Sequence, residues 1–109
     1  MAELKIELLY FEGCPSWKNG LKNLKIALKN EDISNADIQL VLISDEVDAM
    51  NEKFLGSPSF RVNGQDLWPE ERKAYFLGCR VYLTEEGMKG FPTADMLRNK
   101  IRTMRKRIK

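Results

Sequence analysis

The chain has 109 residues, with 18 lysines and arginines against 16 aspartates and glutamates, and it contains no histidine. This length predicts one domain over residues 1–109, and a hydrophobic fraction of 43% is sufficient for one modest core. Without histidine, Cys-His and Ser-His catalytic arrangements are excluded within the chain. The net charge of +2 is too small to indicate nucleic acid as a partner.

The N-terminal sequence MAELKIELLY contains acidic residues and lacks the long apolar run of a signal peptide. No segment has the length of a membrane span, so we expect a cytoplasmic protein with no membrane partner. The two cysteines, Cys14 and Cys79, are then expected to be free thiols. Because the local Cys-x-x-Cys spacing of structural zinc is missing, we expect no metal site and no cofactor.

The first half of the chain alternates between strand and helix patterns. Residues 4–11 carry apolar side chains on both faces, which predicts a central strand covered on both sides. Pro15 suits the first turn of a helix. The amphipathic stripe of that helix is formed by Trp17, Leu21, Leu24 and Leu28. Residues 38–43 predict a second strand, which pairs in parallel with the first.

A short helix is predicted after this second strand. Ser44 is a suitable cap for a helix that begins with DEVDAM, whose acids lie in the first turn. Val47, Met50 and Phe54 are expected to form its buried stripe.

The second half begins with a hairpin signal. Asn63-Gly64 separates strand candidates at 59–62 and 65–68, and Asn-Gly is typical of a tight turn. Residues 69–91 are less regular, although CRVYLT within them alternates like a strand. Thr93 is expected to cap a last helix, with a stripe formed by Leu97, Ile101, Met104 and Ile108. The basic end of this helix is interpreted as a solvated face, so nucleic acid is not expected as a partner.

The order strand–helix–strand, helix, hairpin, helix resembles the thioredoxin-like fold. Cys14 lies between the first strand and its helix, and Ser57-Pro58 immediately precedes the hairpin. The resemblance covers residues 3–68 and 92–107 and leaves 69–91 as an insertion. It implies an α/β fold with a mixed four-stranded sheet, the first strand central and helices on both faces. It also implies that Pro58 follows a cis peptide bond beside Cys14.

Three short sequence segments indicate a smaller family within the thioredoxin-like fold. GCPSW, FLGSPSFRVNG and GCRVY together are similar to a small prokaryotic thioredoxin-like family that automated naming sometimes connects with organomercurial lyase. That connection depends on the cysteine in CRVYLT, which is similar to a catalytic-cysteine segment of the lyase.

The chemistry of Cys14 depends on a second thiol. A cysteine at a helix start is favoured as the reactive thiolate, because the unpaired N–H groups there lower its pKa. A dithiol enzyme resolves its mixed disulfide with a second cysteine, but the position three residues on is Trp17. Three alternatives remain: a small thiol resolves Cys14, Cys79 resolves it, or Cys14 is a relic in a domain that binds something else.

We therefore expect a thiol-dependent redox protein, a possible thiol–disulfide oxidoreductase, that acts on a disulfide protein or a small thiol. The candidate catalytic residues are Cys14 and Cys79. The candidate substrate-binding residues are Pro15, Trp17, Ser57 and Pro58. The main alternative is a non-catalytic thioredoxin-like binding module. Another is organomercurial or soft-metal chemistry, in which two thiolates hold the metal.

Overall fold

The computed structural model describes residues 4–33 and 37–107. A four-stranded sheet has the order β2-β1-β3-β4, and a separate two-stranded hairpin joins β5 and β6. The elements in chain order are β1 (Ile6–Tyr10), α1 (Trp17–Asn30), β2 (Ile38–Leu42), α2 (Glu46–Asn51), β3 (Ser59–Val62), β4 (Gln65–Asp66), β5 (Tyr82–Thr84), β6 (Gly87–Lys89) and α3 (Ala94–Arg107).

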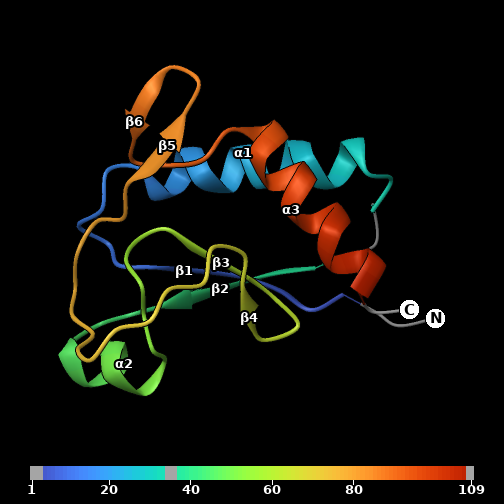
Figure 1. Cartoon of the computed structure of the whole chain (residues 1–109). Coiled ribbons are helices and arrows are strands. Elements are labelled where there is room, and N and C mark those ends of the chain that lie inside the picture. The colour runs from blue at the N-terminus through green and yellow to red at the C-terminus, as the bar shows by residue number, and fades with distance from the viewer. Residues whose placement is uncertain (1–3, 34–36, 108–109) are drawn as a thin grey trace.

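The sheet confirms the predicted fold class. Strand β1 lies in the interior of the sheet, parallel to β2 and antiparallel to β3 (Figure 1). This mixed α/β arrangement is consistent with the thioredoxin-like topology. The hairpin turn is also as predicted, since Asn63 and Gly64 both have positive φ, at 53° and 84°. Strand β4 is shorter than the predicted 65–68, because its ladder covers only Gln65 and Asp66.

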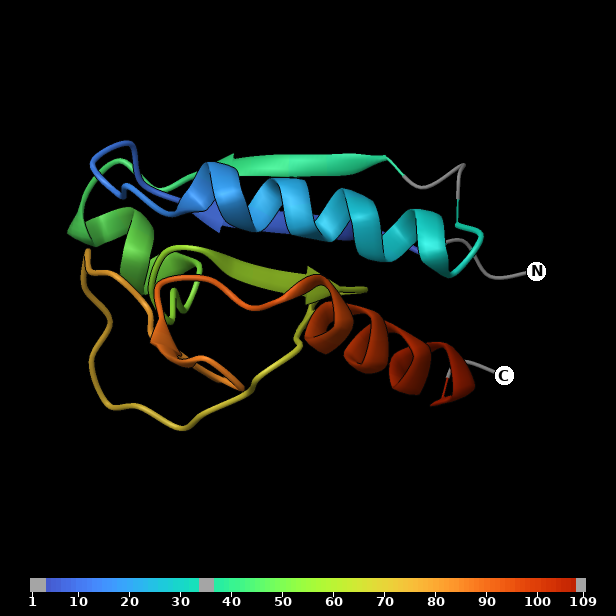
Figure 2. The same ribbon diagram turned by 90° about the horizontal axis from the view of Figure 1, so that it is seen from above.

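Helices cover both faces of the sheet. Helices α1 and α3 pack against each other on one face, and α2 lies on the other (Figures 1 and 2). Leu8 of β1 belongs to the core beneath α1 and α3, whereas its neighbour Leu9 packs with Ala49 and Phe54 on the α2 side. The alternation of side chains along β1 therefore supplies two cores from one strand. No helix in the described ranges is both long and apolar enough to cross a membrane.

The predicted stripe of α2 is wrong in part. Val47 and Met50 are each 64% exposed, whereas Ala49 and Phe54 are fully buried. The helix ends at Asn51, so Phe54 reaches the core through the following turn and does not extend a helical stripe. The cap is also one residue later than predicted, because the Asp48 N–H donates to the Asp45 carboxylate at 2.8 Å.

The segment predicted from CRVYLT is a strand only in its second half, as β5, which pairs with β6 in a small hairpin. The cap of α3 is confirmed, since the Met96 N–H donates to the Thr93 hydroxyl at 3.1 Å. Leu97 and Ile101 of its stripe are buried, and Ile108 lies outside the described residues.

One carboxylate connects the ends of α1 and α3. Glu31 follows α1 and pairs with Arg98 at 2.7 Å, Arg102 at 2.8 Å and Arg105 at 3.7 Å. Hydrogen bonds from Arg102 and Arg98 lower the pKa of Glu31 from 4.5 to about 2. Part of the basic end of α3 is therefore occupied by this contact between helices.

We expect Glu31→Gln to lower the free energy of unfolding by about 1 kcal/mol at neutral pH, near the upper end for ion pairs at a surface. The folded pKa of Glu31 is depressed, so its contribution is complete above pH 4.5 and is lost as the pH falls toward 2. Urea unfolding of both proteins between neutral pH and pH 3 measures this difference. A difference that stayed constant over this range would contradict the role of the Glu31 charge.

Candidate functional site

Cys14 lies in the loop between β1 and α1. Helix α1 begins at Trp17, later than Pro15 predicted, and its cap residue Ser16 makes no side-chain capping bond. The Cys14 N–H donates to the carbonyl of Phe11 at 3.1 Å, which turns the loop back on the end of β1. The Cys14 side chain is only 4% exposed, and its thiol donates a hydrogen bond to the carbonyl of Ser57 at 3.4 Å.

The Ser57-Pro58 peptide bond is cis, as predicted. Ser57 is completely buried, and it binds both cysteine-containing segments. Its hydroxyl accepts a hydrogen bond from the Phe11 N–H at 3.4 Å, and its carbonyl accepts the Cys14 thiol. The loop before β3 is thereby fixed against the loop that carries Cys14.

The insertion 69–91 returns to the same loop. After β4 the chain passes on the α2 side of the sheet, where Tyr75 packs on the smaller core, and then turns toward the start of α1 (Figure 1). There the Ser57 N–H donates to the Gly78 carbonyl at 2.9 Å, and the Arg80 N–H donates to the Ser57 carbonyl at 3.0 Å. Cys79 is thus the parallel bridge partner of Ser57.

This pairing brings the two cysteines together. Their thiols are 4.4 Å apart and are not bonded to each other. A disulfide requires about 2.05 Å between the sulfur atoms, so a movement of roughly 2 Å would join them. The position of Cys79, which the sequence alone leaves open, is therefore next to Cys14.

The two thiols differ in their access to solvent. Cys14 is buried, whereas Cys79 is exposed at the surface of the insertion. Partial desolvation of the Cys79 thiol, with a smaller contribution from the adjacent Cys14 sulfur, raises the pKa of Cys79. An external reagent therefore meets Cys79 first, and its reactive thiolate forms above the ordinary pH range of a cysteine.

The other predicted site residues surround the thiols but are unequally accessible. Pro15 is exposed beside Cys14, and Trp17 is half-buried and stacks on Tyr10 with ring centroids 4.1 Å apart. Pro58 is fully buried, and its carbonyl accepts a 2.6 Å hydrogen bond from the Tyr82 hydroxyl. The insertion therefore covers Ser57 and Pro58, two of the residues expected to meet a substrate.

Two glycines permit the close packing of this region. A Cβ at Gly20 of α1 would lie 3.0 Å from the Pro58 side chain, so glycine lets the helix pack directly on the proline. Gly56 has φ of +116°, and a Cβ there would lie 2.9 Å from the Cβ of Arg80 and 3.2 Å from its backbone. Glycine at 56 thus lets the insertion approach Ser57 closely.

Arg80 is the important residue that the sequence did not reveal. Its side chain is 5% exposed, and it forms an ion pair with Asp66 at 3.0 Å. Its guanidinium also donates to the Ser59 hydroxyl at 3.1 Å and to the Trp68 carbonyl. The strand-like alternation of CRVYLT places Arg80 and Tyr82 on one face, opposite Cys79. The alternation therefore predicts which face Arg80 shares, but it does not identify Asp66 as the ion-pair partner of Arg80.

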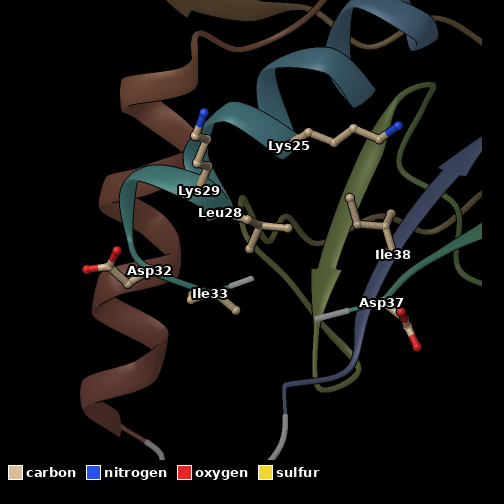
Figure 3. Close-up of a pocket in the computed structure, with 7 residues that line it drawn as sticks. All are labelled: Lys25, Leu28, Lys29, Asp32, Ile33, Asp37 and Ile38. Carbon is tan, nitrogen blue, oxygen red and sulfur yellow. The ribbon is translucent and has the colours of Figure 1, made fainter. Parts of the chain in front are cut away.

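Two hollows in the described part of the surface lie away from the cysteines. One, of about 570 Å³, lies between the end of α1 and the start of β2 (Figure 3). Leu28 and Ile38 line it, with Lys25 and Lys29 at its rim. Helix α1 has 14 residues, so this hollow is about 20 Å from the loop of Cys14. Within residues 4–33 and 37–107, no cluster of three or more cysteine or acidic side chains forms a metal site.

Comparisons with known proteins gave no match. No family model matches the chain, and neither curated proteins nor solved structures matched it. Function is therefore inferred from the two thiols and from the contacts that hold them.

We expect iodoacetamide to modify Cys79 before Cys14 in the native protein, because Cys79 is exposed and Cys14 is buried. The rate at Cys79 should rise with a midpoint above that of an ordinary thiol. In Cys14→Ser this midpoint should move down, because one cause of the raised pKa is removed. Peptide mapping of protein labelled across a pH series measures both effects. Faster labelling of Cys14 would contradict the observed burial.

Proposed function

We propose that this protein carries out thiol–disulfide exchange with Cys14 and Cys79 as its redox pair. The observation that carries the proposal is the 4.4 Å separation of two free thiols. The segments that carry them both form hydrogen bonds with Ser57. Trp17 in place of a local second cysteine does not then leave Cys14 without a partner, because the insertion supplies Cys79. The arrangement also supports membership of a thioredoxin-like redox family and a location in a reducing compartment such as the cytoplasm.

The exposure of the thiols supports an order of events. The Cys79 thiolate attacks one sulfur of an external disulfide, whose S–S bond breaks. The released thiolate takes up a proton, and Cys79 is left in a mixed disulfide with the other half of the substrate. Cys79 acts first in this scheme because it is the thiol that a substrate can reach.

Cys14 completes the exchange. Its thiol loses its proton, together with its hydrogen bond to the Ser57 carbonyl, and its sulfur attacks that of Cys79. The mixed disulfide breaks and releases the second substrate thiol, while Cys14 and Cys79 become an internal disulfide. The protein pair is oxidised by two electrons, and the substrate disulfide is reduced to two thiols. A small thiol of the glutathione class then returns the pair to the reduced form.

A second candidate function is the binding of a soft metal ion. Two metal–sulfur bonds of about 2.3 Å, the length in zinc thiolates, would span about 4.6 Å if they were collinear. This is close to the 4.4 Å between the thiols, and soft thiolate pairs favour Cu(I). The separation therefore supports a two-coordinate site as well as a redox pair.

The redox proposal is tested with oxidised glutathione. Wild-type protein should lose the mass of two hydrogen atoms, through a mixed disulfide that does not accumulate. Cys14→Ser should instead accumulate one glutathionyl group on Cys79, because nothing resolves it. Cys79→Ser should react at least about tenfold more slowly, since its remaining thiol is buried.

Intact-mass spectrometry over time distinguishes these outcomes. Stable glutathionylation of the wild type would contradict the redox pair and favour small-thiol resolution. A protein that did not react at all under these conditions would favour the non-catalytic binding module.

The metal proposal is tested by competition with a Cu(I) chelator. Reduced wild-type protein should bind one Cu(I), and each single serine variant should bind it at least about a hundredfold more weakly, because one of two ligands is lost. Wild-type protein in which both thiols have been oxidised should not bind. Equal affinity of the wild type and either serine variant would contradict a shared site.

A further inference from the structure

We propose that Arg80 is a positioning residue, which sets the place of Cys79 opposite Cys14 through its buried ion pair with Asp66. This inference deepens the proposed function, and it rests on the redox pair of Cys14 and Cys79. Arg80 touches neither a substrate nor a reacting sulfur in the scheme above. Arg80 acts through the backbone, because it fixes the position of the adjacent residue Cys79.

The side chains close to Cys79 on either side make little apolar contact with the core. The regular pairing of the Cys79 segment is a single bridge with Ser57, outside any named strand. Phe76 on one side of Cys79 is 54% exposed, and Val81 on the other is 56% exposed. Apolar burial by these neighbours therefore contributes little to the position of the thiol.

The Arg80 side chain attaches this segment to the sheet in addition to the backbone bonds with Ser57. One guanidinium nitrogen donates to both carboxylate oxygens of Asp66 at 3.0 Å and to the Ser59 hydroxyl at 3.1 Å. The other donates to the Trp68 carbonyl and lies 3.6 Å from Glu70. The guanidinium is thus joined to β3, β4 and the chain that follows them.

The carboxylate has a defined position of its own. Asp66 lies in the β3–β4 hairpin, where it also accepts a 2.7 Å hydrogen bond from the Trp68 N–H. Tyr82, two residues after Arg80, adds a second attachment, because its hydroxyl binds the Pro58 carbonyl and its ring lies 5.3 Å from the guanidinium. The face opposite Cys79 is therefore fixed to the sheet.

Because Arg80 fixes the segment of Cys79, the Cys79 thiol has a high effective concentration at the Cys14 thiol. A segment that is already ordered loses little freedom when the disulfide forms, so the disulfide is favoured over mixed disulfides with a small thiol. When the anchor is removed, the segment becomes free in the reduced protein, and disulfide formation must order it. The equilibrium between the two forms should then move toward the dithiol.

The test is the equilibrium constant of the Cys14–Cys79 disulfide in glutathione buffers, with Arg80→Lys, Arg80→Gln and Asp66→Asn compared with the wild type. We expect the constant to fall at least tenfold in Arg80→Gln and Asp66→Asn. Arg80→Lys should recover part of the loss, because lysine keeps the charge without the planar fork. Circular dichroism establishes that each variant is folded under the assay conditions, and Arg80→Lys and Asp66→Asn keep the test available if Arg80→Gln does not fold.

Glu31→Gln is the matched control. It removes another ion-pair network, at the opposite end of α1 from Cys14, so it should destabilise the reduced and disulfide forms equally. Its disulfide constant should remain within about twofold of the wild type. If the disulfide constant changed equally in Glu31→Gln and Asp66→Asn, the change would reflect a general loss of stability. That result would overturn the positioning role of Arg80.

The pKa of Cys79 is a second readout, which distinguishes a change in the position of Cys79 from a change in the stability of the protein. The neighbouring Cys14 sulfur contributes to the raised pKa of Cys79, so an insertion that moves away should lower that pKa toward the ordinary value. The pH dependence of Cys79 alkylation should therefore shift down in Asp66→Asn and stay unchanged in Glu31→Gln. If the wild type forms no internal disulfide, the proposed function fails. If it does, and the folded Arg80 and Asp66 variants keep the wild-type constant and pKa, only the positioning role fails.

Discussion

The backbone of Ser57 is the contact on which the site depends. Its carbonyl accepts hydrogen bonds from both the Cys14 thiol and the Arg80 N–H, and its own N–H binds Gly78. One buried peptide therefore holds segments that are far apart in the chain. Because buried backbone groups must be paired, the insertion satisfies polar groups of this loop that would otherwise need a partner. The same pairing places Cys79 beside Cys14.

Cys14 is buried, whereas the segment that carries Cys79 is held by polar contacts more than by apolar packing of its neighbours. The main core lies between the sheet and the helices α1 and α3, whereas the segment around Cys79 is largely exposed. A buried ion pair such as Arg80–Asp66 is a weak source of stability, since desolvation offsets its attraction, but its directional bonds favour one arrangement. Burial raises the pKa of Asp66, and the Arg80 charge opposes that shift. Such a pair is suited to fixing the geometry of a small site.

The features that could be predicted from the sequence are those that short-range patterns determine. The sheet order around β1, the Asn63-Gly64 turn and the cis bond before Pro58 follow from local signals or from the family resemblance. The stripe of α2 was wrong because a six-residue helix ends before the periodicity can extend to Phe54. The place of Cys79 was open because it depends on the path of residues 69–91 and on the pairing of this segment with Ser57. Neither the path nor the pairing has a local signal, and the close approach at Gly56 is visible only in three dimensions.

Mapping the disulfides of the oxidised protein tests whether Cys14 and Cys79 are one redox pair. Mild oxidation at low protein concentration, alkylation of remaining thiols and proteolysis without reductant would identify the cross-linked peptides. One major product within a single chain is expected, in which the peptide containing Cys14 is joined to the peptide containing Cys79 by a bond that reduction breaks. Oxidised protein in which both cysteines remained open to alkylation, or were linked only between chains, would contradict the redox pair.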